Sequence, residues 1–159
     1  MNKKQAVMVY LIKDNELLFL NRRKENDDSH VQGKHISIGG KVEPGEGLIE
    51  ACEREVYEEA SIEVGKLDLA GIIYFRGWGE KKKDWINFIF TSTDFKGDPV
   101  DGNEGSFEWH NTSKLDKLDL YEGSEEFLKH IINKNYFVME YQYNIYELIG
   151  HSTLFLSTP

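Results

Sequence analysis

The chain has 159 residues, and domains commonly have about 100–200 residues, so we predict a single domain over residues 1–159. Hydrophobic residues make up 40% and charged residues 30% of the chain, which excludes collagen-like, low-complexity and wholly disordered proteins. The 28 acidic and 19 basic side chains give a formal net charge of -9, which disfavours binding to nucleic-acid polymers and to anionic membranes. A small anionic partner would need a local source of positive charge, for which a bound divalent cation is the obvious candidate.

The cysteine content and the amino-terminal residues bear on the cellular compartment. Cys52 is the single cysteine, which excludes an intramolecular disulfide framework and a multi-thiolate zinc site. The apolar run from Ala6 to Ile12 ends at Lys13 without a small-residue cleavage site, so it predicts a strand and not a signal peptide. No apolar run reaches the ~18–20 residues that span a bilayer. We therefore expect a cytoplasmic protein that is not associated with a membrane.

Short apolar runs alternate with turn signals through the first half of the chain. The pattern predicts a β-hairpin, a mobile polar loop, a glycine-rich turn and a helix. In chain order these are the strands Ala6–Lys13 and Leu17–Asn21 around the turn Asp14–Glu16, the loop Arg22–Gly33, the turn Ile38–Gly47 and the helix Leu48–Ala60.

The second half is again dominated by strand-like patterns. Strands are predicted at Leu69–Phe75 and Trp85–Phe95 around the turn Gly79–Lys83, at Ser106–His110, and through the aromatic tail Tyr136–Phe155. A second helix is predicted at Ser124–Asn133, with Ser124 as its N-cap and Glu125 and Glu126 in its first turn. The fold class is therefore α/β or α+β, with two helices inserted among strands.

Residues 48–60 carry the clearest chemical pattern. At 100° per residue, Ile49, Cys52, Val56 and Ala60 share one arc that should face the core. Beside that arc, Glu59 lies about 40° to one side of Glu55 and Glu58 about 60° to the other. Like charges at these spacings repel one another. A hard divalent cation with oxygen ligands would convert the repulsion into coordination.

The loop before the helix adds to this arrangement. Gly39 and Gly40 allow the backbone to approach a ligand closely, so that a carbonyl could join the oxygen ligands. Pro44-Gly45 predicts a tight turn that brings Glu46 to the start of the helix. The Arg54 guanidinium could then hold Glu46 by a two-pronged hydrogen bond.

The alternative interpretation is that these glutamates form an ordinary solvated helix face. We adopt that interpretation for Glu50, Glu53 and Glu63. Each of six residues at fixed spacing has a probability of ~5–10% by composition. A chance match at all six positions is therefore expected at about one sequence position in a million or fewer. The set that meets this criterion is Gly40, Glu46, Arg54, Glu55, Glu58 and Glu59.

The segment Gly40-x5-Glu46-x7-Arg54-Glu55-Val56-x-Glu58-Glu59-x-Ser61-Ile62 resembles the signature box of the Nudix hydrolases. The opening hairpin and the Asn103-Glu104-Gly105 loop before Trp109 resemble the MutT branch of that family. The resemblance implies a Nudix-type α/β/α sandwich with a central mixed β-sheet and the box helix packed on it. One position departs, because Ser61 stands where the family usually has a glycine that ends the helix in a left-handed conformation.

The resemblance also implies roles for individual residues. Glu55, Glu58 and Glu59 would bind Mg²⁺, for which Mn²⁺ could substitute, together with Glu104 and a carbonyl of Gly39 or Gly40. Either Glu55 or Glu104 would activate water. Arg54 and Glu46 would support the site without taking part in the chemistry.

Substrate contacts follow less directly from the resemblance. Arg22 or Arg23 would contact a phosphate, although a surface charge beside Asp27 and Asp28 is the alternative interpretation. Tyr121 could stack on a base and Glu122 could accept a hydrogen bond from one, whereas Ile36 has no group that could read a base edge. His30 and His35 lie in or beside the mobile loop and could meet the substrate, but a structural role is the favoured interpretation for both.

The resemblance implies Mg²⁺-dependent hydrolysis of a nucleoside diphosphate linked to another moiety. The favoured substrate is a nucleoside triphosphate, oxidised or not, cleaved to the monophosphate and pyrophosphate by a monomer or homodimer. The alternative is a catalytically weak nucleotide-sensing or protein-binding module with the same fold, which Ser61 and the missing base-reading residues would suit. A purely structural acidic helix is the third hypothesis.

Overall fold

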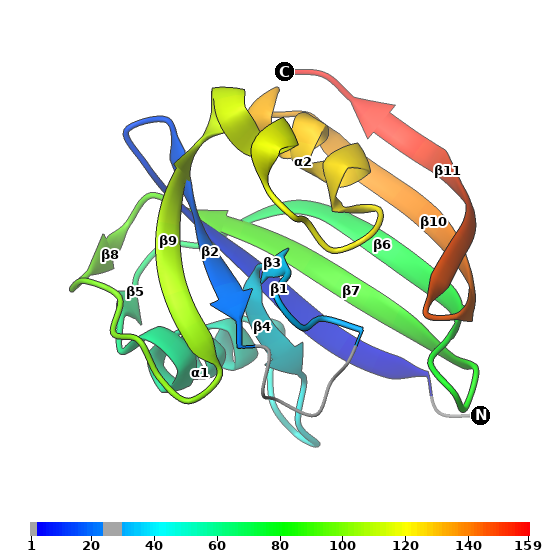
Figure 1. Ribbon diagram of the computed structural model, residues 1–159, viewed down its shortest axis with the longest axis horizontal. Coiled ribbons are helices and arrows are strands. Elements are labelled where there is room, and N and C mark those ends of the chain that lie inside the picture. The colour runs from blue at the N-terminus through cyan, green and yellow to red at the C-terminus, as the bar shows by residue number, and fades with distance from the viewer. Residues whose placement is uncertain (1–2, 24–29) are drawn as a thin grey trace.

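The computed structural model describes residues 3–23 and 30–159. Most of the regular elements are strands, as predicted (Figure 1). They are β1 (Lys4–Lys13), β2 (Glu16–Arg22), β3 (His35–Ile36), β4 (Ile38–Lys41), α1 (Leu48–Ala60), β5 (Glu63–Val64), β6 (Asp68–Trp78), β7 (Lys83–Ser92), β8 (Phe95–Lys96), β9 (Gly105–Asn111), the 3-10 helix η1 (Thr112–Lys117), α2 (Ser124–Ile132), β10 (Tyr136–Ile145) and β11 (Glu147–Ser157).

The described strands form a mixed, nine-stranded sheet in the order β11-β10-β6-β7-β1-β2-β3, with β4 paired to β1 and β9 paired to β2. Strand β1 runs parallel to β7 and antiparallel to both β2 and β4. The remaining pair, β5 and β8, forms a small separate sheet that takes in Phe95. The predicted strand Trp85–Phe95 is therefore interrupted after Ser92.

Alternate residues of β1 face two different hydrophobic clusters. Val7, Val9 and Leu11 pack with the buried side chains of α1, whereas Tyr10 packs with Phe127 and the other buried side chains of α2. Because side chains alternate between the two faces of a strand, the helices cover opposite faces of the sheet. The predicted α+β sandwich, with the helix at 48–60 packed on a mixed sheet, is confirmed.

The first hairpin turns over two residues. Asp14 and Asn15 have φ values of 50° and 63°, and Lys13 pairs with Glu16 across the turn. Positive φ at both central residues is the geometry of a type I′ turn, whose twist matches that of the flanking strands. The hairpin prediction is confirmed.

The buried face of α1 differs from the prediction at one residue. Cys52, Val56 and Ala60 are fully buried as expected, but Ala51 is buried with them while Ile49 is 44% exposed. The prediction for Ile49 is wrong because helical spacing gives the direction of a side chain, not the point along the helix where contact with the sheet begins.

The start of α2 also differs from the prediction. Gly123 is the N-cap, with φ 88°, and Ser124 is the first helical residue and is buried. A left-handed residue at this point favours glycine, so the predicted Ser124 cap is wrong. Glu125 and Glu126 do lie in the first turn, where the helix dipole favours negative charge.

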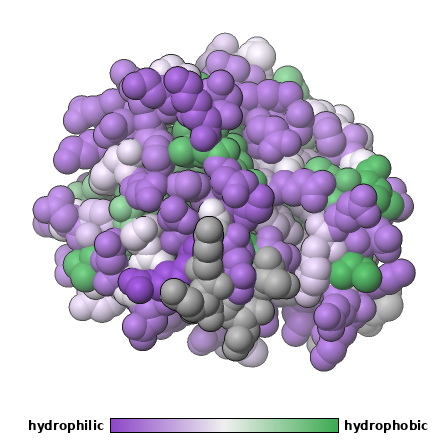
Figure 2. Space-filling view, in the orientation of Figure 1, coloured by the Kyte–Doolittle hydropathy of each residue, from purple (hydrophilic) through white to green (hydrophobic). Residues whose placement is uncertain are grey.

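The surface agrees with the high content of charged residues. Figure 2 shows a largely hydrophilic face on which hydrophobic residues form separate small patches. Within the described residues, no helix is long and apolar enough to cross a membrane.

Candidate functional site

The loop between β4 and α1 is held close to both neighbouring elements. A Cβ atom at Gly39 would lie 2.1 Å from the carbonyl oxygen of Val7, and one at Gly40 would lie 2.2 Å from Oε1 of Glu55. Neither distance is compatible with a side chain. Glycine therefore allows β4 to pair with β1 while the backbone touches a carboxylate of α1.

A turn and a guanidinium then fasten the loop to the helix. The Glu46 N–H donates to the Glu43 carbonyl at 3.0 Å, across Gly45 with φ 81°. Arg54 donates from Nε to Oε1 of Glu46 at 2.6 Å and from Nη2 to Oε2 at 3.0 Å. These bonds from Arg54, with a further one from the Glu43 N–H, lower the pKa of Glu46 to about 2.

Arg54 also contacts the carboxylates further along the helix. Its Nη1 donates to Oε1 of Glu55 at 2.8 Å and to Oε2 of Glu58 at 3.3 Å, and its Nη2 donates to the carbonyl of Lys41 at 3.0 Å. One guanidinium therefore sets the positions of the loop and of two carboxylates relative to each other.

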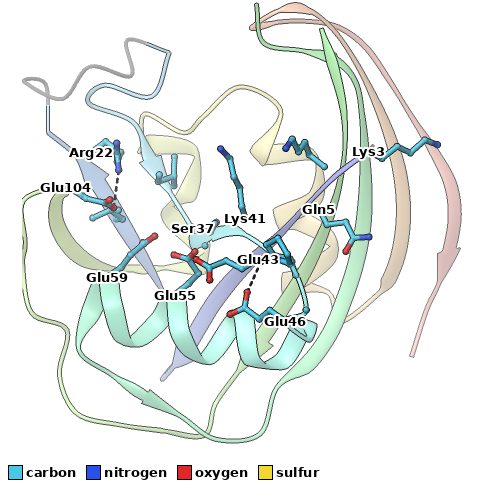
Figure 3. Close-up of a pocket in the computed structure, with 18 residues that line it drawn as sticks. Lys3, Gln5, Arg22, Ser37, Lys41, Glu43, Glu46, Glu55, Glu59 and Glu104 are labelled. Carbon is cyan, nitrogen blue, oxygen red and sulfur yellow. Dashed lines mark hydrogen bonds and ion pairs between the residues drawn. The ribbon is translucent and has the colours of Figure 1, made fainter. Parts of the chain in front are cut away.

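The four carboxylates proposed from the sequence meet at one place. Glu55, Glu58 and Glu59 from α1 and Glu104 from the loop before β9 line one hollow of about 340 Å³. Figure 3 shows Glu55 and Glu59 rising from the helix toward Glu104. Oε2 of Glu104 lies 3.1 Å from Nη1 of Arg22, so the loop is tied to the end of β2.

Glu59 has the most unfavourable electrostatic position in this group. Its Oε2 is buried and has no hydrogen-bond partner. Burial and the negative charges of Glu104 and Glu55 raise the pKa of Glu59 to about 9, against the opposing effects of the Gly39 backbone and Arg22. An unpartnered carboxylate oxygen among other carboxylates fits the oxygen-only ligand set that a hard divalent cation prefers.

A larger cleft of about 960 Å³ adjoins this hollow and shares Glu55, Glu59 and Glu104 with it. Its wall also carries positive charge, because Lys3, Lys4 and Lys41 join Arg22 there. Figure 3 labels Lys3, Lys41 and Arg22 among the lining residues. Sequence reasoning missed these lysines. The lysines meet because β1 pairs with β4, which sets Ala6 opposite Lys41. The spacing of residues in the sequence does not predict this pairing.

The predicted substrate residues lie in different places. Arg22 lines the cleft, whereas Arg23 is exposed and donates its backbone N–H to the Glu104 carbonyl at 3.0 Å. Asp27 and Asp28 lie outside the described residues. Tyr121 accepts a hydrogen bond from Trp78 Nε1 at 3.0 Å, and Glu122 is exposed. Neither Tyr121 nor Glu122 is among the residues that line the cleft, so their roles stay predictions.

Comparison with known proteins accounts for this arrangement. A model of the NUDIX domain family matches residues 2–131. The chain therefore belongs to the Nudix family. Its box follows the family pattern except at Ser61, which adopts the left-handed conformation (φ 58°, ψ 31°) and donates its N–H to Tyr57 as the C-cap of α1.

Curated relatives of this Nudix domain include named Nudix-type hydrolases. It is 32% identical over 83 residues to the oxidized purine nucleoside triphosphate hydrolase of Danio rerio, a match that covers 52% of this chain and 53% of the relative. It is 27% identical over 100 residues to the uncharacterized Nudix hydrolase YvcI of Bacillus subtilis, covering 61% of this chain and 63% of that one. The chain thus spans about half to two-thirds of these relatives.

The fold extends beyond those matches. The crystal structure of a MutT protein from Bacillus halodurans superposes with a TM-score of 0.78 at 24% identity, covering 95% of this chain and 97% of the other. The NUDIX domain of Shewanella oneidensis NrtR, complexed with ADP ribose, gives a TM-score of 0.66 at 12% identity, covering 82% and 87%. Both show that the central sheet and its helices are those of a Nudix fold.

Proposed function

We propose that this Nudix domain hydrolyses a nucleoside diphosphate linked to another moiety in a Mg²⁺-dependent reaction. The favoured substrate is a nucleoside triphosphate, cleaved to the monophosphate and pyrophosphate. The observation that carries the proposal is the meeting of Glu55, Glu58, Glu59 and Glu104 at one hollow beside a lysine-lined cleft.

The metal would be held by those four carboxylates and by a carbonyl of Gly39 or Gly40. Bound there, Mg²⁺ or Mn²⁺ would neutralise phosphate oxygens and make the phosphorus more open to attack. The donors fit this role because all of them are oxygens. Oε2 of Glu59 is buried and has no hydrogen-bond partner, so a bound cation would stabilise its negative charge more than that of any other oxygen in the group.

The protein's own groups would then position the reactants. Arg22, Lys4 and Lys41 line the cleft and would bind the phosphate chain. Both candidate bases contact an arginine, Glu55 contacting Arg54 and Glu104 contacting Arg22. We favour Glu104 because its side chain is the more exposed to water, at 54% against 13% for Glu55. Glu104 would take a proton from water as the water oxygen attacks phosphorus and the P–O bond to the leaving pyrophosphate or nucleoside monophosphate breaks.

The nucleobase of the substrate is inferred from the relatives. The Danio rerio and Mus musculus relatives are named oxidized purine nucleoside triphosphate hydrolases, which supports a purine nucleoside triphosphate. Ile36 lines the cleft but offers a base no hydrogen bond. Any base contacts would come from Tyr121 and Glu122, in the segment whose backbone bonds to His35 next to Ile36.

The test is a phosphate-release screen with Mg²⁺, Mn²⁺ or EDTA. The substrates are nucleoside triphosphates with and without an oxidised base, dinucleoside polyphosphates, nucleotide sugars and dinucleotide cofactors. We expect metal-dependent pyrophosphate release that falls at least ~100-fold in Glu58→Gln. Glu53→Gln is the matched control, because Glu53 is an exposed glutamate of the same helix. Nucleotide binding without turnover on any substrate would favour the sensing module instead.

A further inference from the structure

A second group of metal-ligating side chains lies away from the Nudix carboxylates. His35 of β3 and His110 of β9 each place Nε2 next to Oε2 of Glu108, at 2.8 Å and 2.7 Å. One ligand atom from each of the three residues lies within 4.8 Å of the others. In the described part of the chain, no other group of three or more histidine, cysteine or acidic residues meets that criterion.

Strand β9 separates this group from the Nudix site. Phe107 lines the carboxylate hollow, and Trp109 packs with it in the cluster on the α1 side. Glu108 and His110 alternate with these residues and therefore point to the other face of the strand. There the rings of His35 and His110 lie edge-on to Phe19 of the α2-side core, with centroids 6.3 Å and 6.0 Å away.

The three side chains are partly enclosed but open on one side. The exposed fractions are 11% for His35, 25% for His110 and 37% for Glu108. Asn21 donates to the second carboxylate oxygen of Glu108 at 3.4 Å, which orients the carboxylate. The three donors thus come from β3 and β9, with Asn21 of β2 beside Glu108, while the exposed side of Glu108 leaves room for water as a further ligand.

The hydrogen-bond chemistry explains why an ion can enter here. An ionised carboxylate only accepts hydrogen bonds, so both Nε2 atoms carry a hydrogen and both point at the same oxygen. A cation that takes the place of these hydrogens would bind two imidazole nitrogens and one carboxylate oxygen. Nitrogen ligands suit zinc and other late transition metals, whereas Mg²⁺ and Ca²⁺ prefer oxygen.

We propose that His35, Glu108 and His110 form a transition-metal site of the zinc type, distinct from the Mg²⁺ site of the proposed hydrolase. Its ligand set, two histidines and one carboxylate with an open position, is one that Zn²⁺ uses in proteins. The ion would tie β3 to β9. Because β3 leads directly into β4, the same clamp steadies the strand that carries Gly39 and Gly40.

The other nitrogen of His35 sets the strength of this site. When Nε2 binds a metal, the hydrogen of the neutral ring moves to Nδ1, and a ligating histidine normally donates that hydrogen to an acceptor. Nδ1 of His35 is buried and has no hydrogen-bond partner. The site is therefore weaker than a structural zinc site with a complete outer shell of hydrogen bonds, and we expect folding to proceed without the metal.

The test measures Co²⁺ and Zn²⁺ binding to the full chain with Mg²⁺ in large excess, so that the carboxylate site is already filled. We expect one Co²⁺ per chain under these conditions, with the intense visible absorption of a nitrogen-containing site of low coordination number. His35→Gln and His110→Gln should each weaken binding more than tenfold. His151→Gln is the control, because His151 is an exposed histidine on β11.

A wild-type measurement covers the case in which a variant fails to fold. Co²⁺ should broaden the ring signals of His35 and His110, and not those of His151, in NMR spectra recorded with excess Mg²⁺. The absence of Mg²⁺-resistant binding in the wild-type chain would overturn the proposal, as would unchanged binding in both folded variants. Loss of hydrolysis in Glu58→Gln with Co²⁺ binding intact would show that the two sites are independent.

Discussion

Arg54 of α1 donates hydrogen bonds to both carboxylate oxygens of Glu46, in the loop between β4 and α1, at 2.6 Å and 3.0 Å. The same guanidinium contacts Glu55, so its geometry positions both the loop and a carboxylate that we propose as a metal ligand. Lysine keeps the charge but loses the planar, two-pronged contact. We predict that Arg54→Lys lowers kcat by ~10–100-fold, the range seen when outer-shell partners of a metal site are changed.

Arg76→Lys provides the matched control for that substitution. Arg76 pairs with Glu140 at 2.6 Å between β6 and β10, which is an ion pair unrelated to the carboxylate site. Steady-state kinetics at saturating Mg²⁺ should separate the two variants. Equal kcat values for both would show that the Arg54 geometry is not needed.

Gly40 provides a second prediction. A methyl group at Gly40 would fall 2.2 Å from Oε1 of Glu55, so the carboxylate must turn away from the hollow. We expect Gly40→Ala to weaken Mg²⁺ binding and to lower turnover at least ~10-fold, since a ligand is displaced. Gly150→Ala, at a glycine of β11 with nothing within 4 Å of the added carbon, should leave both unchanged. Calorimetric titration with Mg²⁺ gives the comparison, and normal Mg²⁺ affinity in Gly40→Ala would count against Glu55 as a ligand.

The pKa of Glu59 predicts an unusual pH dependence of stability. In the folded chain without metal this pKa is about 9, against an ordinary value of 4.5. Between these values the folded state holds a proton that the unfolded state has lost, so this group makes the free energy of unfolding fall as pH rises from 4.5 to 9. The slope is at most ~1.4 kcal/mol per pH unit, and partial exposure makes it smaller.

Glu59→Gln should remove this penalty. In EDTA we expect the variant to match the wild-type stability near pH 5 and to exceed it near pH 8, by ~1–3 kcal/mol. Mg²⁺ should raise the melting temperature of the wild type and have little effect on the variant. Urea unfolding at the two pH values measures the difference. A variant less stable than the wild type at pH 8 in EDTA would contradict the cause assigned to the pKa shift.

Ser61 gives a prediction about stability alone. It ends α1 in the left-handed conformation, which costs a residue with a Cβ about 1 kcal/mol relative to glycine. Ser61→Gly should therefore stabilise the chain by about 1 kcal/mol and raise Tm by ~2–4 °C with turnover unchanged. Ser152→Gly, in the extended strand β11, should not stabilise it. A lower Tm for Ser61→Gly would show that the serine makes a compensating contact.

Sequence patterns predicted the structure correctly wherever the interacting residues are close together in the sequence. Two residues tolerant of positive φ predict the turn at Asp14-Asn15. Helical spacing places Glu55, Glu58 and Glu59 on one side of α1, and the spacing of Glu46 from Arg54 anticipates the contact that the structure contains. The α1 contact of Ile49 and the start of α2 at Gly123 were not predictable in this way, because both depend on where a helix meets the sheet.

The sequence by itself determined the family and the residues of the box, because these lie within one loop and one helix and their spacing alone brings them together. Only the tertiary structure decided which distant residues join them. The pairing of β1 with β4 brings Lys4 and Lys41 to the cleft, and the pairing of β9 with β2 fixes the position of Glu104. The approach of β3 to the same strands sets His35 against Glu108 and His110. Four of the acidic side chains of the chain thus gather at the hollow lined by Glu55, Glu58, Glu59 and Glu104, and lysines line the cleft beside it.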